Sequence, residues 1–546
     1  MSQKASIVGE LRKLLRRDSD SIDWMWSVGL LLAALLLFGT NLGSLPLRDW
    51  DEGTVAQVAR NIWRAADGSL TWLYPTLDGE PYLNKPPLVH WLMAIAYSIG
   101  GVSEWTSRLP GAMLTALSVP VLYGVGRELF HRRTPALFAA LVYLTSLPVA
   151  RHGRLAMLDG PLLCFMLVML WCLLRSRRNS RYALGIGIGF GLVCLTKGIM
   201  MGALLGAIAL LFLFLDTPRL LTTTYFWLGI GLGSLPVAFW YGAQWVHYGQ
   251  LFVSDNLVDQ SFSRVWAPVE DNTGPPWYYL LELIKYGFPW LLFWPLGFRC
   301  AWEHRNLSWA KLALVWSVLY LVAISAMVTK LPWYVLPIYP ALALITGQQL
   351  AVFWDHGNSI SITPGEPGPY SRIWPGIFGM LALVTGVGCF YFVRLSVPPE
   401  QDLAVIMAAL TITLLTAMIL VARRDPQFTV ILIWGTYVAL VILMLSSHWI
   451  WELAESYPVK PVAALIQQHT PPGTKVYTSF PDGRPSLNFY SDRQVVPVPD
   501  KRLKQRWQRD HHPYFLLDQS GVKRLTLEPK QILGTSEGLT LITKKP

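Results

Sequence analysis

The chain has 546 residues, of which 53% are hydrophobic and only 14% are charged. Soluble domains usually carry about 25% charged residues, so this composition excludes an ordinary soluble protein and indicates a protein of the lipid bilayer. The formal net charge of +11 does not indicate a nucleic-acid partner. Lys and Arg gather at the ends of apolar segments, where basic residues set the orientation of membrane helices.

A basic N-terminal tail, residues 1–23, precedes an apolar run at 24–42. Basic flanks stay in the cytoplasm, so the tail is predicted to be cytoplasmic and the run to be the first spanning helix. No signal-peptide cleavage site follows the run, so we expect it to remain in the protein. The next apolar stretch, 86–100, is short and follows a Lys-Pro motif, and we interpret it as an interfacial or re-entrant helix.

Further apolar runs of spanning length alternate with short polar clusters up to residue 447. Basic clusters at 127–133 and 175–181 are both expected in the cytoplasm, which requires an even number of spans between them. Residues 24–447 are then predicted to form a transmembrane domain of about thirteen spans, each able to cross a hydrocarbon core of about 30 Å. Its predicted external loops are 43–108, 150–158 and 247–276.

An odd number of spans places the C-terminal segment, residues 448–546, outside. There the apolar runs shorten to the length of strands, and Pro, Gly and charged residues return, which predicts a small soluble domain. The predicted fold class is therefore an all-α polytopic membrane protein with about thirteen transmembrane helices and a small C-terminal α/β extracytoplasmic domain.

The predicted spans hold almost no ionisable residues near their centres, which argues against an ion-coupled transporter. A glycine-rich run at 185–191 would fit a substrate groove, but small residues favour close packing between two helices, which is the prediction here. Polar side chains gather instead on the predicted external face: Asp51, Glu52, Lys85, Asp159, Asp255, Arg264, Lys330 and Tyr334. A carboxylate there can accept a proton from an acceptor hydroxyl, and cations can stabilise a leaving phosphate. The pattern therefore indicates chemistry on a phosphorylated, lipid-borne substrate.

Ordinary structural roles also fit these residues one at a time. Asp51 and Asp159 can each cap the N-terminus of a helix. Lys85 can extend its ammonium group from an interfacial helix toward water, and Tyr334 is a common type of residue at a membrane interface. Their joint placement on one predicted face favours a functional role.

Four segments resemble one known family. The stretch RDWDEGTVAQVARNIWRAADGSLTWLYPTLDGEPYLNKPPLVHWL, at 48–92, resembles the first external loop of membrane glycosyltransferases with the C-type fold. Specifically, it is similar to the group that unites protein O-mannosyltransferases with lipid A aminoarabinose transferases. RLAMLDGPL at 154–162, LTKG at 195–198 and KLPWYVLPIYPALALITG at 330–347 are also similar to that group. The resemblance runs in order from about residue 42 to residue 347.

The resemblance implies an enzyme, a glycosyltransferase that takes its sugar from a polyprenyl-phosphate donor, undecaprenyl phosphate in bacteria. It implies transfer with inversion to a glycolipid such as lipid A, a polysaccharide or a protein, on the outer face of the bacterial inner membrane. Asp51 would be the general base or would orient the acceptor, with Glu52 beside it and Asp159 as the second acidic position. The implied ligands of the donor phosphate or sugar are Lys85, Arg264, Lys330 and Tyr334.

The chain departs from the family where the family binds a metal ion. Asn84 stands where an acidic residue precedes the Lys-Pro lysine, and Asn256 stands in place of a histidine. Few strong ligands remain, so we expect no firm divalent-metal site, with Asp159 and Asp255 as the weak candidates. Thr54 stands where the family often has Arg, so a different sugar or acceptor is expected.

Two other interpretations compete with the glycosyltransferase. A flippase for a lipid-linked sugar would require a polar path across the bilayer, which the nearly charge-free spans do not offer. A non-catalytic envelope scaffold would use the external α/β domain to bind a partner, and it would tolerate substitutions in the external loops.

Overall fold

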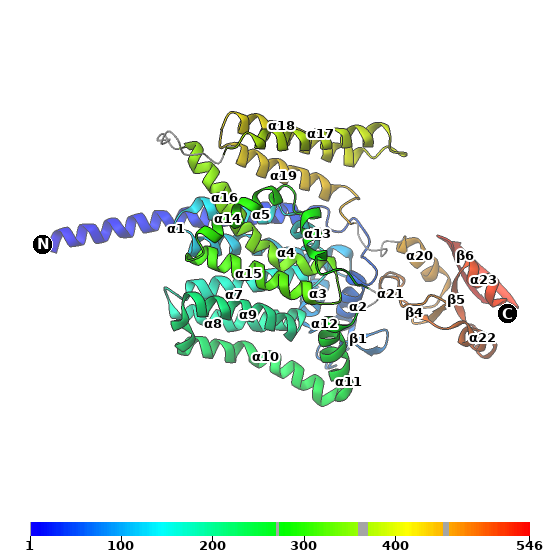
Figure 1. Ribbon diagram of the computed structural model, residues 1–546. Helices are drawn as coiled ribbons and strands as arrows, with labels where there is room; N and C mark the ends of the chain where they lie inside the picture. The colour runs from blue at the N-terminus through cyan, green and yellow to red at the C-terminus, as the bar shows by residue number, and fades with distance from the viewer. Residues whose placement is uncertain (1, 269–271, 359–369, 451–457, 546) are drawn as a thin grey trace. The chain divides into compact units, whose positions relative to one another are not determined.

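The computed structural model describes residues 2–268, 272–358, 370–450 and 458–545 (Figure 1). The chain divides into two compact units. Unit 1 contains Met1–Asn41, Asn84–Pro86 and Gly111–Trp449, and unit 2 contains Leu42–Leu83, Pro87–Pro110 and Ile450–Pro546.

Long apolar helices dominate the transmembrane part of the chain. Nine stretches of the described residues are long and apolar enough to cross a bilayer. They are Asp20–Gly39 in α1 (Ser2–Gly39), α4 (Glu104–Leu129), α9 (Ile199–Asp216), α10 (Thr224–Tyr248), α15 (Ser308–Ala326), Pro332–His356 in η5 and α16, α17 (Ile373–Arg394), α18 (Gln401–Ala422) and α19 (Phe428–Leu445). The predicted polytopic helical class is confirmed, while the exact number of thirteen spans stays a prediction.

Shorter helices complete unit 1. Three of them, α5 (Arg133–Leu144), α7 (Asp159–Arg175) and α8 (Ala183–Lys197), coincide with predicted spans. The remaining short helices are α6 (Leu147–His152), η1 (Ser180–Tyr182), η2 (Pro218–Thr222), α11 (Gln250–Phe252), the π-helix η3 (Val253–Phe262), α12 (Ser263–Trp266), α13 (Tyr278–Tyr286), η4 (Trp290–Phe293) and α14 (Trp294–Glu303). The spanning stretch Pro332–His356 consists of η5 (Pro332–Ile338) and most of α16 (Tyr339–Asn358).

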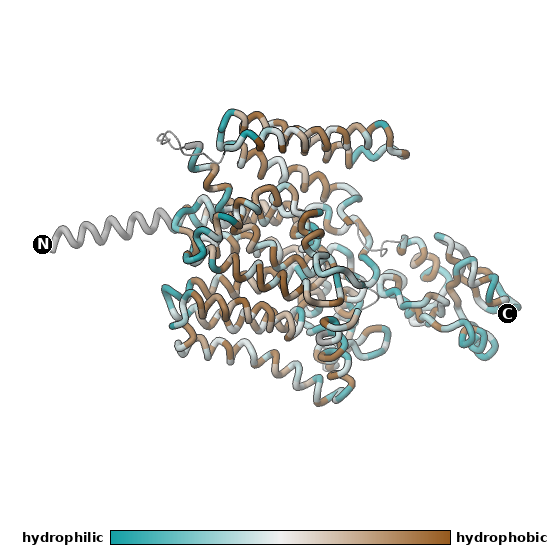
Figure 2. Tube along the Cα trace, in the orientation of Figure 1, coloured by the Kyte–Doolittle hydropathy of each residue, from teal (hydrophilic) through white to brown (hydrophobic). Residues whose placement is uncertain are grey.

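The outer surface of unit 1 is apolar. Figure 2 shows long hydrophobic stretches along its helices, and the exposed side chains of α10 and α17 include Leu235, Phe239, Leu383 and Phe390. So many exposed large apolar groups would be costly in water, whereas lipid chains solvate them well. The surface therefore fits a helix bundle surrounded by lipid.

The glycine-rich run of α8 packs directly on α10. A Cβ atom placed at Gly233 would lie 1.8 Å from the carbonyl oxygen of Gly187, and one at Gly191 would lie 2.1 Å from the carbonyl oxygen of Gly233. Such a close approach of two backbones leaves room only for hydrogen atoms at these positions. The predicted role of the run in helix packing is confirmed.

Unit 2 contains a five-stranded mixed sheet in the order β4-β3-β5-β7-β6. Its strands are β3 (Lys475–Thr478), β4 (Gln494–Pro497), β5 (Tyr514–Asp518), β6 (Lys530–Ser536) and β7 (Leu539–Lys544), with helices α20 (Val459–His469), α21 (Pro485–Ser491), α22 (Asp500–Arg509) and α23 (Gln519–Leu525). β3 pairs in parallel with β4 and β5, while β7 runs antiparallel to β5 and β6. The predicted small α/β domain is confirmed; below, residues 458–545 are called the C-terminal domain.

Most of the first predicted external loop, residues 43–83 and 87–108, also belongs to unit 2. It forms α2 (Asp51–Arg64), a short hairpin of β1 (Thr76–Leu77) and β2 (Glu80–Pro81), and α3 (Leu88–Gly100). α3 is too short to span a bilayer, as predicted for an interfacial helix. α2 packs on α21 of the C-terminal domain, so residues more than 400 positions apart in the sequence share one unit.

Candidate active site

Four predicted site residues meet in unit 1. Lys85 precedes Pro86, Asp159 is the first residue of α7, Arg264 lies on α12, and Tyr334 lies on η5. The bundle joins these four segments although up to 249 positions separate them in the sequence. The following contacts define a site that we call the cationic cluster.

A buried ion pair lies at the centre of this cluster. The Lys197 ammonium group, on the last residue of α8, donates a hydrogen bond of 2.5 Å to Asp159 Oδ1. The side chains of Lys197 and Asp159 are only 10% and 3% exposed. A buried charge needs a partner of opposite sign, and Asp159 and Lys197 provide this partner for each other.

A second set of contacts joins Arg264 to its neighbours. Arg264 donates one hydrogen bond of 2.7 Å to Tyr334 Oη and another of 2.7 Å to Gln260 Oε1. The Lys85 ammonium group also donates to Gln260 Oε1, at 3.3 Å. The Lys197 ammonium lies 5.4 Å from the centre of the Tyr334 ring, within the range of a cation–π contact. These contacts connect all six side chains.

The cluster holds three cations and one carboxylate. Burial is the main reason why the pKa of Lys85 lies well below that of an ordinary lysine; repulsion from Arg264 and Lys197 adds to this, and attraction to Asp159 opposes it. A phosphate placed among these cations would relieve their repulsion and accept charge-assisted hydrogen bonds. The arrangement is therefore suited to an anion such as a phosphate.

Lys197 and Gln260 were not predicted as site residues. Lys197 lies inside the LTKG segment that carried part of the family resemblance, so a signal for it existed. No sequence motif contained Gln260. Its side chain reaches the cluster because of the way the π-helix Val253–Phe262 winds, which the sequence did not predict.

Lys330, one of the predicted phosphate ligands, is engaged by backbone carbonyl groups. Its ammonium group donates hydrogen bonds to the carbonyl oxygens of Ile324, Ser325 and Met327, at 3.2, 2.7 and 2.5 Å. These carbonyls lie at or just beyond the C-terminal end of α15, where a cation is favourable. All three donors of the ammonium group are thus used locally, and we leave Lys330 out of the cationic cluster.

The candidate metal ligands do not converge. Within the described residues, no group of three His, Cys, Asp or Glu side chains is arranged to hold a metal ion. Asp159 is paired with Lys197, and Asp255 accepts a 3.3 Å hydrogen bond from the neighbouring Ser254. A site surrounded by three cations does not fit a divalent cation, and no chemical step below uses one.

Asp51 and Glu52, the first two residues of α2, have different environments in unit 2. The Glu52 side chain is fully buried, and Arg108 donates 2.8 Å hydrogen bonds to both of its carboxylate oxygens. Asp51 keeps 18% of its side chain exposed and accepts a 3.3 Å hydrogen bond from Arg48. Asp51 can therefore meet a substrate, whereas Glu52 anchors α2 through Arg108, and the catalytic role expected of Glu52 stays a prediction.

Asp51 also does not hold the N-cap position of its helix, which belongs to Trp50. Its carboxylate lies one position later, in the first turn, where the helix dipole favours a negative charge. The structural alternative of a helix cap therefore does not account for Asp51.

The C-terminal domain holds α2 at both ends. Near the start of α2, the buried Asp49 accepts hydrogen bonds from Ser486 Oγ at 2.6 Å and from Ser486 N at 3.2 Å. Burial raises the pKa of Asp49, although the bonds from Ser486 and the charge of Arg484 oppose this. Further along, Arg60 donates to the carbonyl oxygen of Phe489 at 2.6 Å.

Two arginines of α2 share one carboxylate of the C-terminal domain. Arg60 and Arg64 both form an ion pair with Asp492, and the Arg60 side chain is only 4% exposed. A Cβ atom at Gly53 would lie 2.7 Å from the backbone nitrogen of Ser486, so the two helices touch without an intervening side chain. The helix that carries Asp51 is thus fixed by contacts within unit 2.

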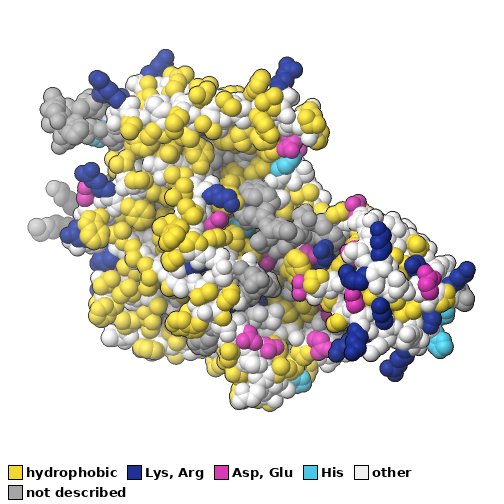
Figure 3. All heavy atoms as spheres, turned by 45° about the vertical axis from the view of Figure 1, so that its right-hand side comes forward, with side chains coloured by type: hydrophobic (Ala, Val, Ile, Leu, Met, Phe, Trp, Pro, Cys, Tyr) yellow, Lys and Arg dark blue, Asp and Glu magenta, His cyan; other side chains and the backbone are white. Residues whose placement is uncertain are grey.

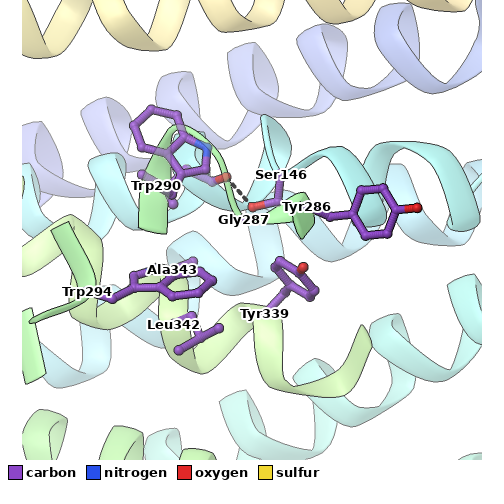
Figure 4. Close-up of a pocket in the computed structure, with 9 residues that line it drawn as sticks. Ser146, Tyr286, Gly287, Trp290, Trp294, Tyr339, Leu342 and Ala343 are labelled. Atoms are coloured by element: carbon purple, nitrogen blue, oxygen red, sulfur yellow. Dashed lines mark hydrogen bonds between the residues drawn. The ribbon is translucent and has the colours of Figure 1, made fainter. Parts of the chain in front are cut away.

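Unit 1 also has an apolar crevice (Figure 4). Trp290, Trp294 and Tyr339 form its walls together with Val142, Ser146, Tyr286, Gly287, Leu342 and Ala343. The Ser146 hydroxyl donates its hydrogen bond to the carbonyl oxygen of Val142, at 2.7 Å. The lining contains no charged residue, so the crevice suits hydrocarbon and not phosphate.

The comparisons with known proteins identify the class of fold. The family described as dolichyl-phosphate-mannose-protein mannosyltransferase matches residues 84–241. The solved structure of ArnT from Cupriavidus metallidurans bound to undecaprenyl phosphate superposes with a TM-score of 0.77 and 19% identity, covering 95% of this chain and 98% of that chain. An oligosaccharyltransferase from Archaeoglobus fulgidus has a TM-score of 0.54 and 12% identity, over 92% and 69% of the two chains. The protein has the C-type fold of membrane glycosyltransferases.

Sequence similarity points to one group of enzymes within this fold class. An undecaprenyl phosphate-alpha-4-amino-4-deoxy-L-arabinose arabinosyl transferase of Pseudomonas fluorescens is 30% identical over 375 residues, covering 66% of this chain and 65% of the relative. A transferase of the same name from Pectobacterium carotovorum is 28% identical over 342 residues, covering 58% of each protein. The chain thus spans less than two thirds of these relatives. Its resemblance to the aminoarabinose and O-mannosyltransferase group is confirmed.

Proposed function

We propose that this protein is an inverting glycosyltransferase that moves a sugar from a polyprenyl-phosphate donor to an acceptor. The convergence of Lys85, Lys197 and Arg264 around Asp159 and Tyr334 carries the proposal, because the leaving group of such a donor is a phosphate. The printed names of the relatives, which contain undecaprenyl phosphate and a transferred sugar, support the same donor class.

In the proposed site, Lys85 and Arg264 hold the donor phosphate. Both can donate charge-assisted hydrogen bonds, and the phenol of Tyr334 keeps the Arg264 guanidinium oriented. Lys197 is held by Asp159 at the base of the cluster, where its charge adds to the field on the phosphate. As the bond from the sugar to the phosphate breaks, these cations stabilise the negative charge that develops.

Asp51 is the proposed general base. The acceptor oxygen forms a bond to the anomeric carbon while the bond from that carbon to the phosphate oxygen breaks. The acceptor proton passes to the Asp51 carboxylate, and the polyprenyl phosphate leaves with the bonding electrons. The proposal rests on the family motif and on the partly exposed position of this carboxylate.

The proposed acceptor is an anionic glycolipid such as lipid A; a polysaccharide or a protein is the alternative. We place the reaction on the outer face of a bacterial inner membrane, with the N-terminus in the cytoplasm and the C-terminal domain in the periplasm. The basic N-terminal tail and the basic clusters of the predicted inner loops support this orientation.

The test is a transfer assay with the purified protein, cell-envelope extract and undecaprenyl phosphate that carries radiolabelled sugars. We expect label to leave the carrier with the wild type and not with D51N, while the control D67N, an exposed Asp of the same unit, stays active. The labelled product identifies the acceptor.

A fully active D51N variant would overturn the assignment of the base, and no transfer with any sugar would overturn the enzyme class. Transport of the intact lipid-linked sugar into liposomes, without transfer, would establish the flippase instead. Binding of an envelope protein by the C-terminal domain, without transfer or transport, would establish the scaffold.

A further inference from the structure

Most of the net positive charge lies in the C-terminal domain. Residues 458–545 contain 14 Lys and Arg but only 7 Asp and Glu, whereas the whole chain contains 45 and 34. Figure 3 shows many of these cations on the surface of the domain. The domain therefore carries a net charge of +7 (14 minus 7), which basic residues at the ends of membrane helices do not explain.

Helix α22 concentrates this charge. Five of its ten residues are basic, namely Lys501, Arg502, Lys504, Arg506 and Arg509. The buried Leu503 and Trp507 anchor the helix in the core, where the Trp507 ring lies 5.3 Å from that of Phe515. Because these two anchors lie one turn apart on one side of the helix, the opposite side faces away from the core. All five basic residues are exposed.

Most cations of α22 have no counter-charge in the part of the chain that the structure describes. Arg506 contacts Asp510 and Tyr477, and the acidic Asp500 is already paired with Arg524. Among the described residues, Lys501, Arg502, Lys504 and Arg509 form no ion pair and no side-chain hydrogen bond.

The spacing of these cations is itself unfavourable. Lys501 and Lys504 are three positions apart, and Arg502 and Arg506 are four apart, so like charges are neighbours on the helix surface. A helix with this pattern is stabilised when an external anion lies along it. The four unpaired cations are called the basic face of α22.

We propose that the basic face of α22 binds the anionic headgroups of membrane lipids. The C-terminal domain belongs to a chain whose helices are built for the bilayer, so a lipid surface is the anionic partner that is always near it. Each cation beside an anionic lipid surface raises the binding constant for that surface about fivefold. The contact is independent of the proposed transfer reaction.

The test uses the full-length protein in two kinds of lipid nanodisc, one of phosphatidylcholine alone and one of an equal mixture of phosphatidylcholine and phosphatidylglycerol. Acetylation rates of individual lysines are followed by mass spectrometry. We expect Lys501 and Lys504 to react several-fold more slowly in the anionic disc, and this protection to disappear at high salt. Lys475, an exposed lysine on β3, is expected to react equally in both discs.

Variants then locate the contact. R502Q/R509Q keeps both reporter lysines and is expected to lose most of the protection, while K523Q/K545Q, which removes two exposed charges elsewhere in the domain, retains it. Equal rates for Lys501 and Lys504 in the two discs would overturn the proposal. Protection by a DNA oligonucleotide in the neutral disc, without protection by phosphatidylglycerol, would also overturn it in favour of a nucleic-acid partner.

Discussion

Asp159 and Lys197 form a buried ion pair across 2.5 Å, at the start of α7 and the end of α8. Each charge is the main compensation for the other, and Lys197 also lies above the ring of Tyr334. One pair therefore contributes to folding and shapes the field of the cationic cluster.

Removal of either partner should expose both roles. D159N or K197M leaves one buried charge alone, and this should destabilise the protein by about 3–5 kcal/mol. The double variant D159N/K197M should recover much of that loss in thermal unfolding of the detergent-solubilised protein. It should not recover transfer activity, because the cluster then lacks one cation. Recovery of both properties would show that the pair has only a structural role.

The pH dependence of donor binding should follow Lys85. Its pKa is low, mainly because of burial, so Lys85 loses its proton at a lower pH than an ordinary lysine. Only the protonated form can hold a phosphate by charge. The KM for the donor should therefore rise as the pH increases through the lowered pKa of Lys85. In K85R this rise should shift to higher pH, since guanidinium keeps its proton; an unchanged profile in K85R would contradict the assignment.

The Arg264 guanidinium should contribute through geometry as well as charge. R264K keeps the charge but cannot bond Tyr334 and Gln260 in the same planar arrangement. We expect R264Q to raise the KM for the donor about 10- to 100-fold, as for the loss of a charge-assisted hydrogen bond. R264K should raise this KM by a smaller factor. The exposed Arg299, whose partner is Glu303 on the same helix, provides the control R299Q, which should leave KM unchanged.

The contacts between α2 and the C-terminal domain predict that a substitution outside the cationic cluster lowers both stability and activity. D492A removes the carboxylate shared by Arg60 and Arg64 and leaves the Arg60 side chain, 4% exposed, without it. The expected cost is about 1–3 kcal/mol of stability, together with lower kcat as α2 becomes less well fixed. The exposed Asp482 provides the matched control D482A. Equal effects of the two variants would contradict a role of Asp492 in fixing α2.

Two glycines of α10 give a test of the helix bundle. G233A places a methyl group against the backbone of Gly187, whereas a Cβ at Gly231 meets nothing within 4 Å. G233A should therefore separate α8 from α10 and sharply reduce the yield of folded protein, at a cost of at least about 1–3 kcal/mol. G231A should be expressed as well as the wild type. Similar yields for both variants would show that the two helices do not pack in this way.

Hydropathy and charge were enough to predict a polytopic helical protein, a short helix within the apolar stretch 86–100 and a small α/β fold near the C-terminus. These features depend on local composition: an apolar run of sufficient length enters lipid whatever its neighbours are. The family motifs likewise pointed to Lys85, Asp159, Arg264 and Tyr334, which the bundle brings into one unit.

The partners of those residues required the folded chain. Glu52 and Lys330 looked like site residues in the sequence, yet Arg108 and the carbonyl groups at the end of α15 engage them. Lys197 and Gln260 lacked an assigned role, yet they complete the cationic cluster. Ion pairs and hydrogen bonds act over only a few ångströms. The role of a side chain therefore depends on which distant segment packs beside it, and local composition does not determine that segment.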